Sequence, residues 1–234
     1  MQLSLRLSAI AEMVTEGNRL VDVGCDHGYL PVYLLLNKKI PGAIAMDVRT
    51  GPLSRAQEHI VQYGLEGYIE TRLSDGLAAL RPGEGNTLVI AGMGGPLMER
   101  ILKDGKKQRE SFRELILQPQ SDIPRFRRFI RRQGWEIADE NIVLEDGKFY
   151  PMMKVVKQEG DFVSWTAEEE TFGKLLLDKC HPVLKMYLER EKRIHEEILS
   201  RLDTAPGEAA EKRKREIEEE MQLIHAALKR YESI

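Results

Sequence analysis

The sequence predicts an α/β domain built on a mixed sheet of seven strands, followed by a helical hairpin. Between residue 19 and about residue 157, short β-branched runs alternate with helical stretches, and from about residue 166 onward no strand pattern remains. Hydrophobic residues make up 42% of the chain, which suits a packed core. The 234 residues are enough for one large domain, or for one domain and a small appendage.

Seven short apolar runs are typical of strands. We expect these strands at residues 19–23, 43–47, 68–73, 87–91, 114–117, 135–140 and 149–156. The expected helices between and after them span residues 29–37, 52–63, 96–102 and 124–133. Strand–helix alternation predicts parallel strands covered on both faces. The last two strands lie close together across a turn at Asp146-Gly147, so they form an antiparallel pair that makes the sheet mixed.

The C-terminal part has the pattern of two long helices. A helix is expected from Lys174 to Leu202, with a kink or a late start near Pro182, and the segment 203–207 breaks it. The apolar stripe of the first helix is predicted at Leu184, Leu188, Ile194, Ile198 and Leu202. The second helix has a heptad seam at Ile217, Met221, Ile224, Leu228 and Tyr231. We therefore predict a coiled-coil-like hairpin and two domains, residues 1–157 and 166–234.

Composition limits the other classes of protein. The chain carries 35 basic and 38 acidic residues, and this net charge of −3 does not by itself indicate a nucleic-acid partner. Two cysteines are too few for a disulfide scaffold or a four-thiolate zinc site, and no metal is expected. No stretch approaches the ~18 to 20 apolar residues of a membrane helix. We expect a cytoplasmic protein with no membrane association, and a monomer rather than a dimer.

The strongest local signal is a glycine turn after the first strand. The strand runs into a turn bounded by Gly24 and Gly28, and a helix follows. Gly24 lets the backbone turn sharply and lets a ligand approach it closely. Asp47 ends the next strand, where a carboxylate can accept both hydroxyls of a ribose. Together these features predict a nucleoside cofactor, although a glycine pair at such a turn suits packing alone equally well.

The charge of this turn indicates which cofactor it suits. A dinucleotide site needs the spacing G-x-G-x-x-G, and Asp26 inside the loop would repel a pyrophosphate. S-adenosylmethionine carries a sulfonium and an ammonium group and no phosphate. Asp22 or Asp26 is suited to the ammonium group, and Asp75, after the third strand, to the adenine amino group. Acidic residues at the ends of three strands favour a methyltransferase, although Asp is also a common turn residue.

Two further strand ends are candidates for contact with a flat base. Three glycines at Gly92, Gly94 and Gly95 keep side chains away from the space above the cofactor. They also suit a plain helix start at Pro96. The fifth strand ends in Leu117-Gln118-Pro119-Gln120, whose amides could bond a base edge, although Gln118 also suits a plain loop position.

Several motifs together resemble one known family. They are Asp22 to Pro31 (D-V-G-C-D-H-G-Y-L-P), Gly51-Pro52-Leu53, Ser74 to Leu77, Ala91 to Gly95 (A-G-M-G-G) and Gln118-Pro119. In this pattern the chain is similar to the bacterial tRNA (adenine-22-N1)-methyltransferases over nearly its whole length. It departs from the family where Gly28 replaces a usual alanine and Asp47 a usual glutamate. The resemblance implies a class I, Rossmann-like methyltransferase fold.

The implied reaction is methyl transfer from S-adenosylmethionine to N1 of an adenine in tRNA. Asp26 is the expected catalytic carboxylate, which stabilises the charge that develops on the base, and Tyr29 stacks on the base or orients it. The expected cofactor contacts are Asp22, Gly24, Cys25, His27, Gly28, Asp47, Val48, Ser74, Asp75, Gly76, Ala91, Gly92, Met93 and Gly94. The expected substrate contacts are Arg6, Gly95, Gln118, Pro119, Arg127, Arg128, Arg131 and Arg132.

The arginines are chosen because the charge is unevenly distributed. Residues 103–132 hold 10 basic and 4 acidic residues, a net charge of +6 beside the ends of the fourth and fifth strands. Such a run suits phosphate contacts, and it is also common on a solvated helix face. Residues 161–234 have a net charge of −4, although Lys212 to Arg215 could hold one arm of a tRNA. Whether the hairpin contacts RNA or only braces the fold stays open.

Three other functions are compatible with parts of the pattern. One is a methyltransferase acting on another RNA, a protein or a small molecule. A second is a nucleotide-dependent oxidoreductase, against which the spacing of Gly24 and Gly28 counts. A third is a scaffold that uses its heptad seam to bind partners and has no activity.

Overall fold

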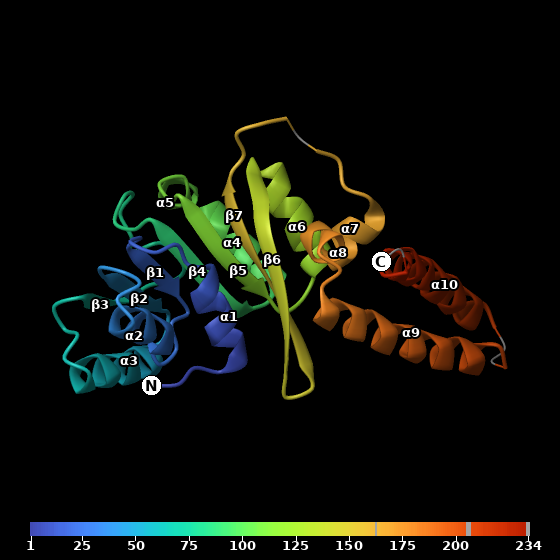
Figure 1. The fold of residues 1–234 in the computed structure, drawn as a ribbon, viewed down its shortest axis with the longest axis horizontal. Helices are drawn as coiled ribbons and strands as arrows, with labels where there is room; N and C mark the ends of the chain where they lie inside the picture. Colours follow the sequence, from blue (N-terminus) through green and yellow to red (C-terminus); the bar gives the residue numbers. More distant parts are fainter. Residues whose placement is uncertain (162, 205–206, 233–234) are drawn as a thin grey trace. The chain divides into compact units, whose positions relative to one another are not determined.

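The computed structural model describes residues 1–161, 163–204 and 207–232, and the chain divides into two compact units, 1–161 and 162–234. The first unit contains a sheet of seven strands with the order β3-β2-β1-β4-β5-β7-β6 (Figure 1). The strands are β1 (Leu20–Val23), β2 (Ala43–Asp47), β3 (Ile69–Leu73), β4 (Thr87–Met93), β5 (Glu114–Pro119), β6 (Trp135–Glu145) and β7 (Lys148–Lys157). The helices of this unit are α1 (Leu5–Met13), α2 (Tyr29–Leu36), α3 (Thr50–Gln62), α4 (Gly95–Asp104), α5 (Lys106–Arg109) and α6 (Ile123–Arg132).

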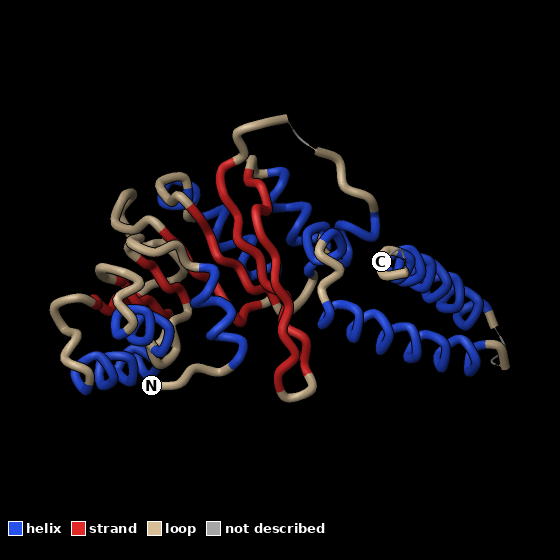
Figure 2. The backbone as a smooth tube through the Cα atoms, in the orientation of Figure 1, coloured by secondary structure: helices blue, strands red, loops and turns tan. Residues whose placement is uncertain are grey.

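Strands β1 to β5 are parallel, and β6 and β7 form the antiparallel part (Figure 2). This arrangement confirms the predicted mixed seven-stranded sheet. β1, β2 and β5 are buried along their whole length, because helices cover both faces of the parallel part. β1 pairs with β2 on one side and with β4 on the other, so the chain changes direction across the sheet at β1. Ligands of open α/β sheets bind beside such a point, at the carboxyl ends of the strands.

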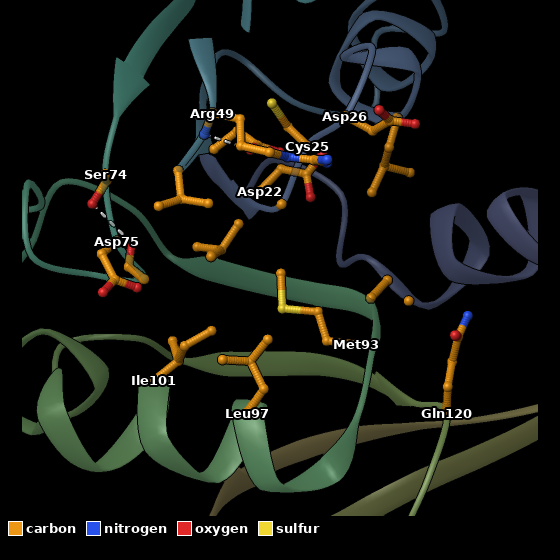
Figure 3. Close-up of a pocket in the computed structure, with 18 of the residues that line it drawn as sticks. Asp22, Cys25, Asp26, Arg49, Ser74, Asp75, Met93, Leu97, Ile101 and Gln120 are labelled. Carbon is orange, nitrogen blue, oxygen red and sulfur yellow. Dashed lines mark hydrogen bonds and ion pairs between the residues drawn. The ribbon is translucent and has the colours of Figure 1, made fainter. Parts of the chain in front are cut away.

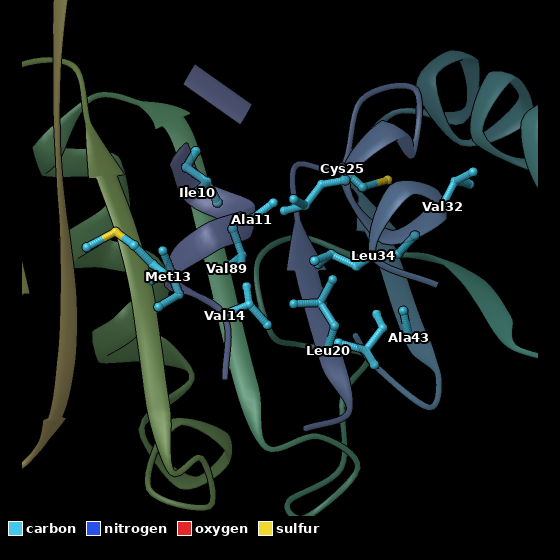
Figure 4. Close-up of a cluster of buried hydrophobic side chains, with 14 of the residues drawn as sticks. Ile10, Ala11, Met13, Val14, Leu20, Cys25, Val32, Leu34, Ala43 and Val89 are labelled. Carbon is cyan, nitrogen blue, oxygen red and sulfur yellow. The ribbon is translucent and has the colours of Figure 1, made fainter. Parts of the chain in front are cut away.

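Helices α1, α2 and α3 cover one face of the sheet. They pack Ile10, Val14, Leu34 and Ile60 against alternate strand residues such as Val89 (Figure 4). The other face is covered by α4 and α6, which lie behind the sheet in Figure 1 and bury residues such as Met98 and Phe126. Neither α1 nor α5 was expected from the sequence.

Two lysines fix α1 at its carboxyl end. Lys39 donates to the carbonyl oxygens of Ala11 and Glu12 at 2.8 and 3.0 Å, and Lys154 donates to the carbonyl oxygen of Met13 at 3.1 Å. A cation at this end satisfies carbonyl groups that have no partner within the helix. The amino-terminal turn of α1, which carries Arg6, is thereby held against the sheet.

The antiparallel pair is longer than the sequence predicts. β6 and β7 pair from Trp135 and Lys157 to Glu145 and Lys148. The predicted turn at Asp146-Gly147 is confirmed: both residues have positive φ, 49° and 73°, as a two-residue hairpin turn requires.

The described residues of the second unit, 163–204 and 207–232, form four helices. They are α7 (Ala167–Phe172), α8 (Lys174–Asp178), α9 (Pro182–Leu202) and α10 (Glu208–Lys229). α9 starts at Pro182, which occupies the first turn where its missing N–H costs nothing, so the expected late start is confirmed. α9 and α10 pack together as the predicted hairpin.

The apolar seam of this hairpin differs from the prediction at two positions. In α9, Ile194 is 37% exposed and His195 is buried. His195 lies seven residues after Leu188, and its Nε2 is 2.7 Å from a carboxylate oxygen of Glu220 on α10. In α10 the buried residue of the last turns is Ala227 in place of Leu228. The heptad spacing therefore located the seam correctly. The choice of Ile194 was wrong because His195, with Glu220 as its polar partner, occupies the buried position.

Candidate functional site

A pocket of about 550 Å³ lies at the carboxyl ends of β1 to β4 (Figure 3). Its volume is within the range of ligand sites for molecules of nucleoside size. The predicted cofactor residues that line it are Asp22, Gly24, Cys25, Asp47, Val48, Ser74, Asp75, Gly76, Ala91, Gly92 and Met93. Both predicted catalytic residues, Asp26 and Tyr29, and the predicted substrate residue Arg6 also line the pocket.

Two of the carboxylates in the pocket wall are buried. Asp22 and Asp47, from the ends of β1 and β2, are 5% and 6% exposed. Burial, and secondly the charge of Asp47, raises the pKa of Asp22 to about 7. A carboxylate in this state gains from a cationic ligand, because the ligand compensates for the water that burial removed.

The other two carboxylates are more accessible. The Asp26 and Asp75 side chains are 66% and 63% exposed. Asp75 pairs with Arg100 of α4 at 3.3 Å, and the Asp47 carboxylate accepts from the backbone N–H of Arg49 at 2.9 Å. In Figure 3, Asp75 and Asp26 lie on different sides of the open space, with Met93 rising between Asp75 and Gln120.

The turn after β1 holds these residues by its backbone conformation. Gly24, Asp26 and Gly28 have φ values of 77°, 49° and 69°. Of these, only Asp26 has a side chain to strain in the left-handed region, where Asp is tolerated better than most residues. The amides of Gly24 and Cys25 donate to the carbonyl oxygen of Met46 at 2.8 and 3.0 Å, which anchors the turn to β2.

Gly28 and His27 do not line the pocket, contrary to the prediction. Gly28 begins α2 and packs on α3, since a Cβ there would lie 3.0 Å from the Cβ of Ala56. The His27 ring stacks on Tyr29, with ring centroids 5.4 Å apart, and its carbonyl oxygen lies 2.8 Å from Nδ1 of His59. These two residues therefore shape the turn and do not face the cavity. The predicted Gly94 also lies outside the pocket lining.

Cys25 lines the pocket but is buried, 7% exposed, in the core cluster under α2. Burial and the neighbouring carboxylates, Asp22 foremost, raise the pKa of its thiol. The thiol therefore stays protonated and is a poor nucleophile.

Gln118 is buried, 1% exposed, and does not line the pocket, so its base contact stays a prediction that the pocket lining does not support. Its Oε1 accepts from the backbone N–H of Gly92 at 3.1 Å and from Arg6 at 3.3 Å. Arg6 also lies over the ring of Tyr150, 5.6 Å from its centroid. Gln118 thus positions two pocket residues. Pro119 and Gly95 likewise lie outside the lining, and a Cβ at Gly95 would collide with the carbonyl oxygen of Ser121.

The basic run is also different from the prediction. Arg127 and Arg131 are 2% and 7% exposed, so the expectation that they face solvent is wrong. Arg127 pairs at 2.8 Å with Glu140 of β6, which is itself buried. Arg128 is half-buried and Arg132 is exposed. α6 has a buried face that is wider than the apolar residues alone indicate, because carboxylates from other elements accept its arginines.

Eight lining residues are absent from the predicted site residues. They are Leu7, Val23, Leu30, Arg49, Leu97, Arg100, Ile101 and Gln120. Leu97, Arg100 and Ile101 lie three and four positions apart on α4, and this spacing on the helix after the glycine-rich strand end could have found them. The sequence offers the Gln120 amide beside that of Gln118 at the end of β5, and the base contact was assigned to Gln118 and Pro119 instead.

The described residues contain no cluster of His, Cys, Asp and Glu side chains that could hold a metal ion. Within the same ranges, no helix combines the length and the apolar character that crossing a membrane would require.

Comparison with known proteins gives consistent matches. The family model of a methyltransferase domain matches residues 3–153. The chain is 34% identical, over 96% of each chain, to the tRNA (adenine(22)-N(1))-methyltransferase of Bacillus subtilis.

Two solved structures match along the whole chain. A Streptococcus pneumoniae protein described as a putative tRNA (m1A22) methyltransferase, in complex with S-adenosyl-L-methionine, has a TM-score of 0.87 and 32% identity over 97% of this chain and 100% of its own. M. capricolum TrmK in complex with S-adenosylhomocysteine has a TM-score of 0.83 and 25% identity over 98% of this chain and 99% of its own.

Proposed function

The chain belongs to the tRNA (adenine(22)-N(1))-methyltransferase family, and we propose that it uses the pocket at the ends of β1 to β4 to methylate N1 of an adenine in tRNA. The observation that carries the proposal is the pair of buried carboxylates, Asp22 and Asp47, in the pocket wall. A phosphate-bearing cofactor is unsuited to this wall, whereas the sulfonium and ammonium groups of S-adenosylmethionine fit it.

Each end of the pocket suits one part of S-adenosylmethionine. Asp47 is suited to the ribose hydroxyls, and Asp75, whose Oδ1 pairs with Arg100, is suited to the adenine amino group. Asp22 is suited to the ammonium group, since a cation at that position would lower its raised pKa. When bound, S-adenosylmethionine supplies a methyl group on a sulfonium, which the lone pair of adenine N1 attacks as the carbon–sulfur bond breaks.

The chain's own residues orient the base and stabilise its charge. N1 of adenine carries a lone pair, so no base has to remove a proton before attack, and positioning supplies much of the rate gain. The methylated ring is cationic. Asp26, at the mouth of the pocket, is placed to stabilise this charge and to accept from the N6 amino group, and Tyr29 beside it offers a ring on which the base can stack.

The tRNA backbone requires exposed cations, and those of the basic run lie on α5, directly before β5, and at the end of α6, toward the amino ends of the parallel strands. Arg132 of α6, with Lys106 and Lys107 of α5, remains exposed, in contrast to Arg127 and Arg131. We assign phosphate contacts to these three residues and to Arg128. The protein is expected to act as a monomer in the cytoplasm.

Methyl transfer to unmodified tRNA transcripts tests the proposal. Incubation with labelled S-adenosylmethionine should label a subset of transcripts, and mapping should place N1-methyladenine at position 22. A protein that binds S-adenosylmethionine but methylates no transcript would contradict the function.

A further inference from the structure

We propose that Gln120 selects the target base by bonding the N6–N7 edge of adenine, so that N1 is left facing the methyl donor. This inference rests on the proposed function and adds a specificity-determining residue to the same site. It replaces the base contact that the sequence assigned to Gln118.

The two glutamines at the end of β5 have different surroundings. Gln118 is 1% exposed and uses its amide on Gly92, Arg6 and the carbonyl oxygen of Pro119. Gln120 is exposed and lines the pocket. Its backbone N–H donates to the carbonyl oxygen of Met93 at 2.8 Å, which fixes where its side chain begins.

Gln120 lies at the acceptor end of the pocket. In Figure 3 its amide lies on the far side of Met93 from Asp75, the residue suited to the cofactor adenine. With the cofactor adenine at the Asp75 end, the target base must enter from the end that contains Asp26, Tyr29, Arg6 and Gln120.

Gly92 keeps open the space in front of this amide. Its φ is 76°, at a register shift between β4 and β5. A Cβ at this position would lie 3.4 Å from Nη1 of Arg6 and 3.8 Å from Nε2 of Gln120. The two side chains therefore converge over a residue without a side chain, which brings the Arg6 guanidinium and the Gln120 amide to one point of the pocket wall.

The chemistry of the amide matches one edge of adenine. A glutamine amide can donate to N7 and accept from N6 of adenine at the same time. Methylation at N1 requires the Watson–Crick edge to face the cofactor, so the N6–N7 edge is the part of the base that remains for recognition. Guanine presents an acceptor at O6 in place of the N6 donor, and an amide held to accept there would be left opposed to it.

The test compares adenine with 7-deazaadenine at the target position of a tRNA. The deaza base keeps N1 and N6 and lacks the N7 acceptor. For each protein we compare kcat/KM on the adenine substrate with kcat/KM on the 7-deazaadenine substrate. We expect this ratio to be about 10-fold larger for wild type than for the Gln120→Leu variant. Because the comparison is between two proteins on the same two substrates, any change in N1 nucleophilicity cancels.

Two controls keep this result interpretable. Gln62→Leu, an exposed change on α3 outside the pocket lining, should leave the wild-type preference intact, and Gln120→Leu should keep the wild-type Tm and affinity for S-adenosylmethionine. If Gln120→Leu and wild type show the same preference for adenine, Gln120 does not bond N7 and the inference is wrong. If wild type methylates no tRNA at all, it is the proposed function that fails.

Discussion

The pocket carboxylates and the basic run of residues 103–132 are both clusters of charge that the sequence predicts to be functional, and the structure treats them differently. Asp22, Asp26, Asp47 and Asp75 all line one cavity. The arginines of the run are instead distributed over several partners inside the protein. Arg125 pairs with Glu99, Arg127 with Glu140 and Arg109 with Glu110.

The difference has a topological cause. Parallel strands end at one edge of the sheet, so residues that follow them converge whatever their distance in sequence. Residues along a helix point in all directions, and their availability depends on which carboxylates other elements bring near. Charge at strand ends therefore indicates a site more directly than charge along a helix.

The largest expected effect is on the free energy of unfolding, and it tests whether Arg127 stabilises the fold or binds RNA. Arg127→Met removes the 2.8 Å ion pair with the buried Glu140, which should lower the free energy of unfolding by about 3–5 kcal/mol. The double variant Arg127→Met/Glu140→Leu should recover much of this loss. Denaturant unfolding measures both. A variant of unchanged stability that has lost tRNA affinity would place Arg127 on the RNA and break the comparison.

The second-largest expected effect is on S-adenosylmethionine binding and concerns the buried carboxylate of Asp22. Asp22→Asn should weaken S-adenosylmethionine binding by about 10- to 100-fold, because a charge-assisted bond to the ammonium group is lost. The same change should stabilise the ligand-free protein. The folded-state pKa of about 7 lies above the unfolded value, so wild type loses stability as pH rises from about 4 to 7, and the variant does not.

Thermal unfolding across pH measures this second part. The Tm advantage of Asp22→Asn should be largest at pH 8 and should shrink as pH falls toward 4. An advantage that is independent of pH would mean that Asp22 is not a destabilising buried charge.

The smallest effect belongs to the exposed end of the basic run. Arg132→Gln should weaken tRNA binding by a few-fold and reduce the slope of log affinity against log salt by about 1, as loss of one phosphate contact does. Lys185→Gln, an exposed change in the second unit, tests whether any lost cation has this effect. An Arg132→Gln slope equal to that of wild type would remove Arg132 from the RNA surface.

Much of the fold is predictable because its signals are local. The strands, the Asp146-Gly147 turn and the start of α9 at Pro182 each follow from residues close in sequence. α1 was missed because its position depends on lysines from distant segments, Lys39 and Lys154.

The site residues that local signals mark were likewise predictable, and those whose role depends on distant partners were not. The carboxylates were found from strand ends, whereas the roles of Gln118 and Gln120 depend on which amide finds partners inside the fold. Arg100 and Ile101 come from α4, the helix after the glycine-rich end of β4, whose spacing the prediction did not use. What sequence reasoning cannot supply is the partner of each polar group, and that partner decides whether the group is available to a ligand.

The most direct test of this account is the single-turnover rate of Asp26→Asn with saturating tRNA and S-adenosylmethionine. Asp146→Asn is the matched control, since Asp146 has the same left-handed conformation, φ 49°, and lies in the β6–β7 turn. We expect the Asp26 variant to be about 100-fold slower, with tRNA affinity within about 2-fold of wild type, and the control to be unaffected. A wild-type rate for Asp26→Asn, or a loss of rate that is matched by a loss of tRNA binding, would contradict the role of this carboxylate in the transfer.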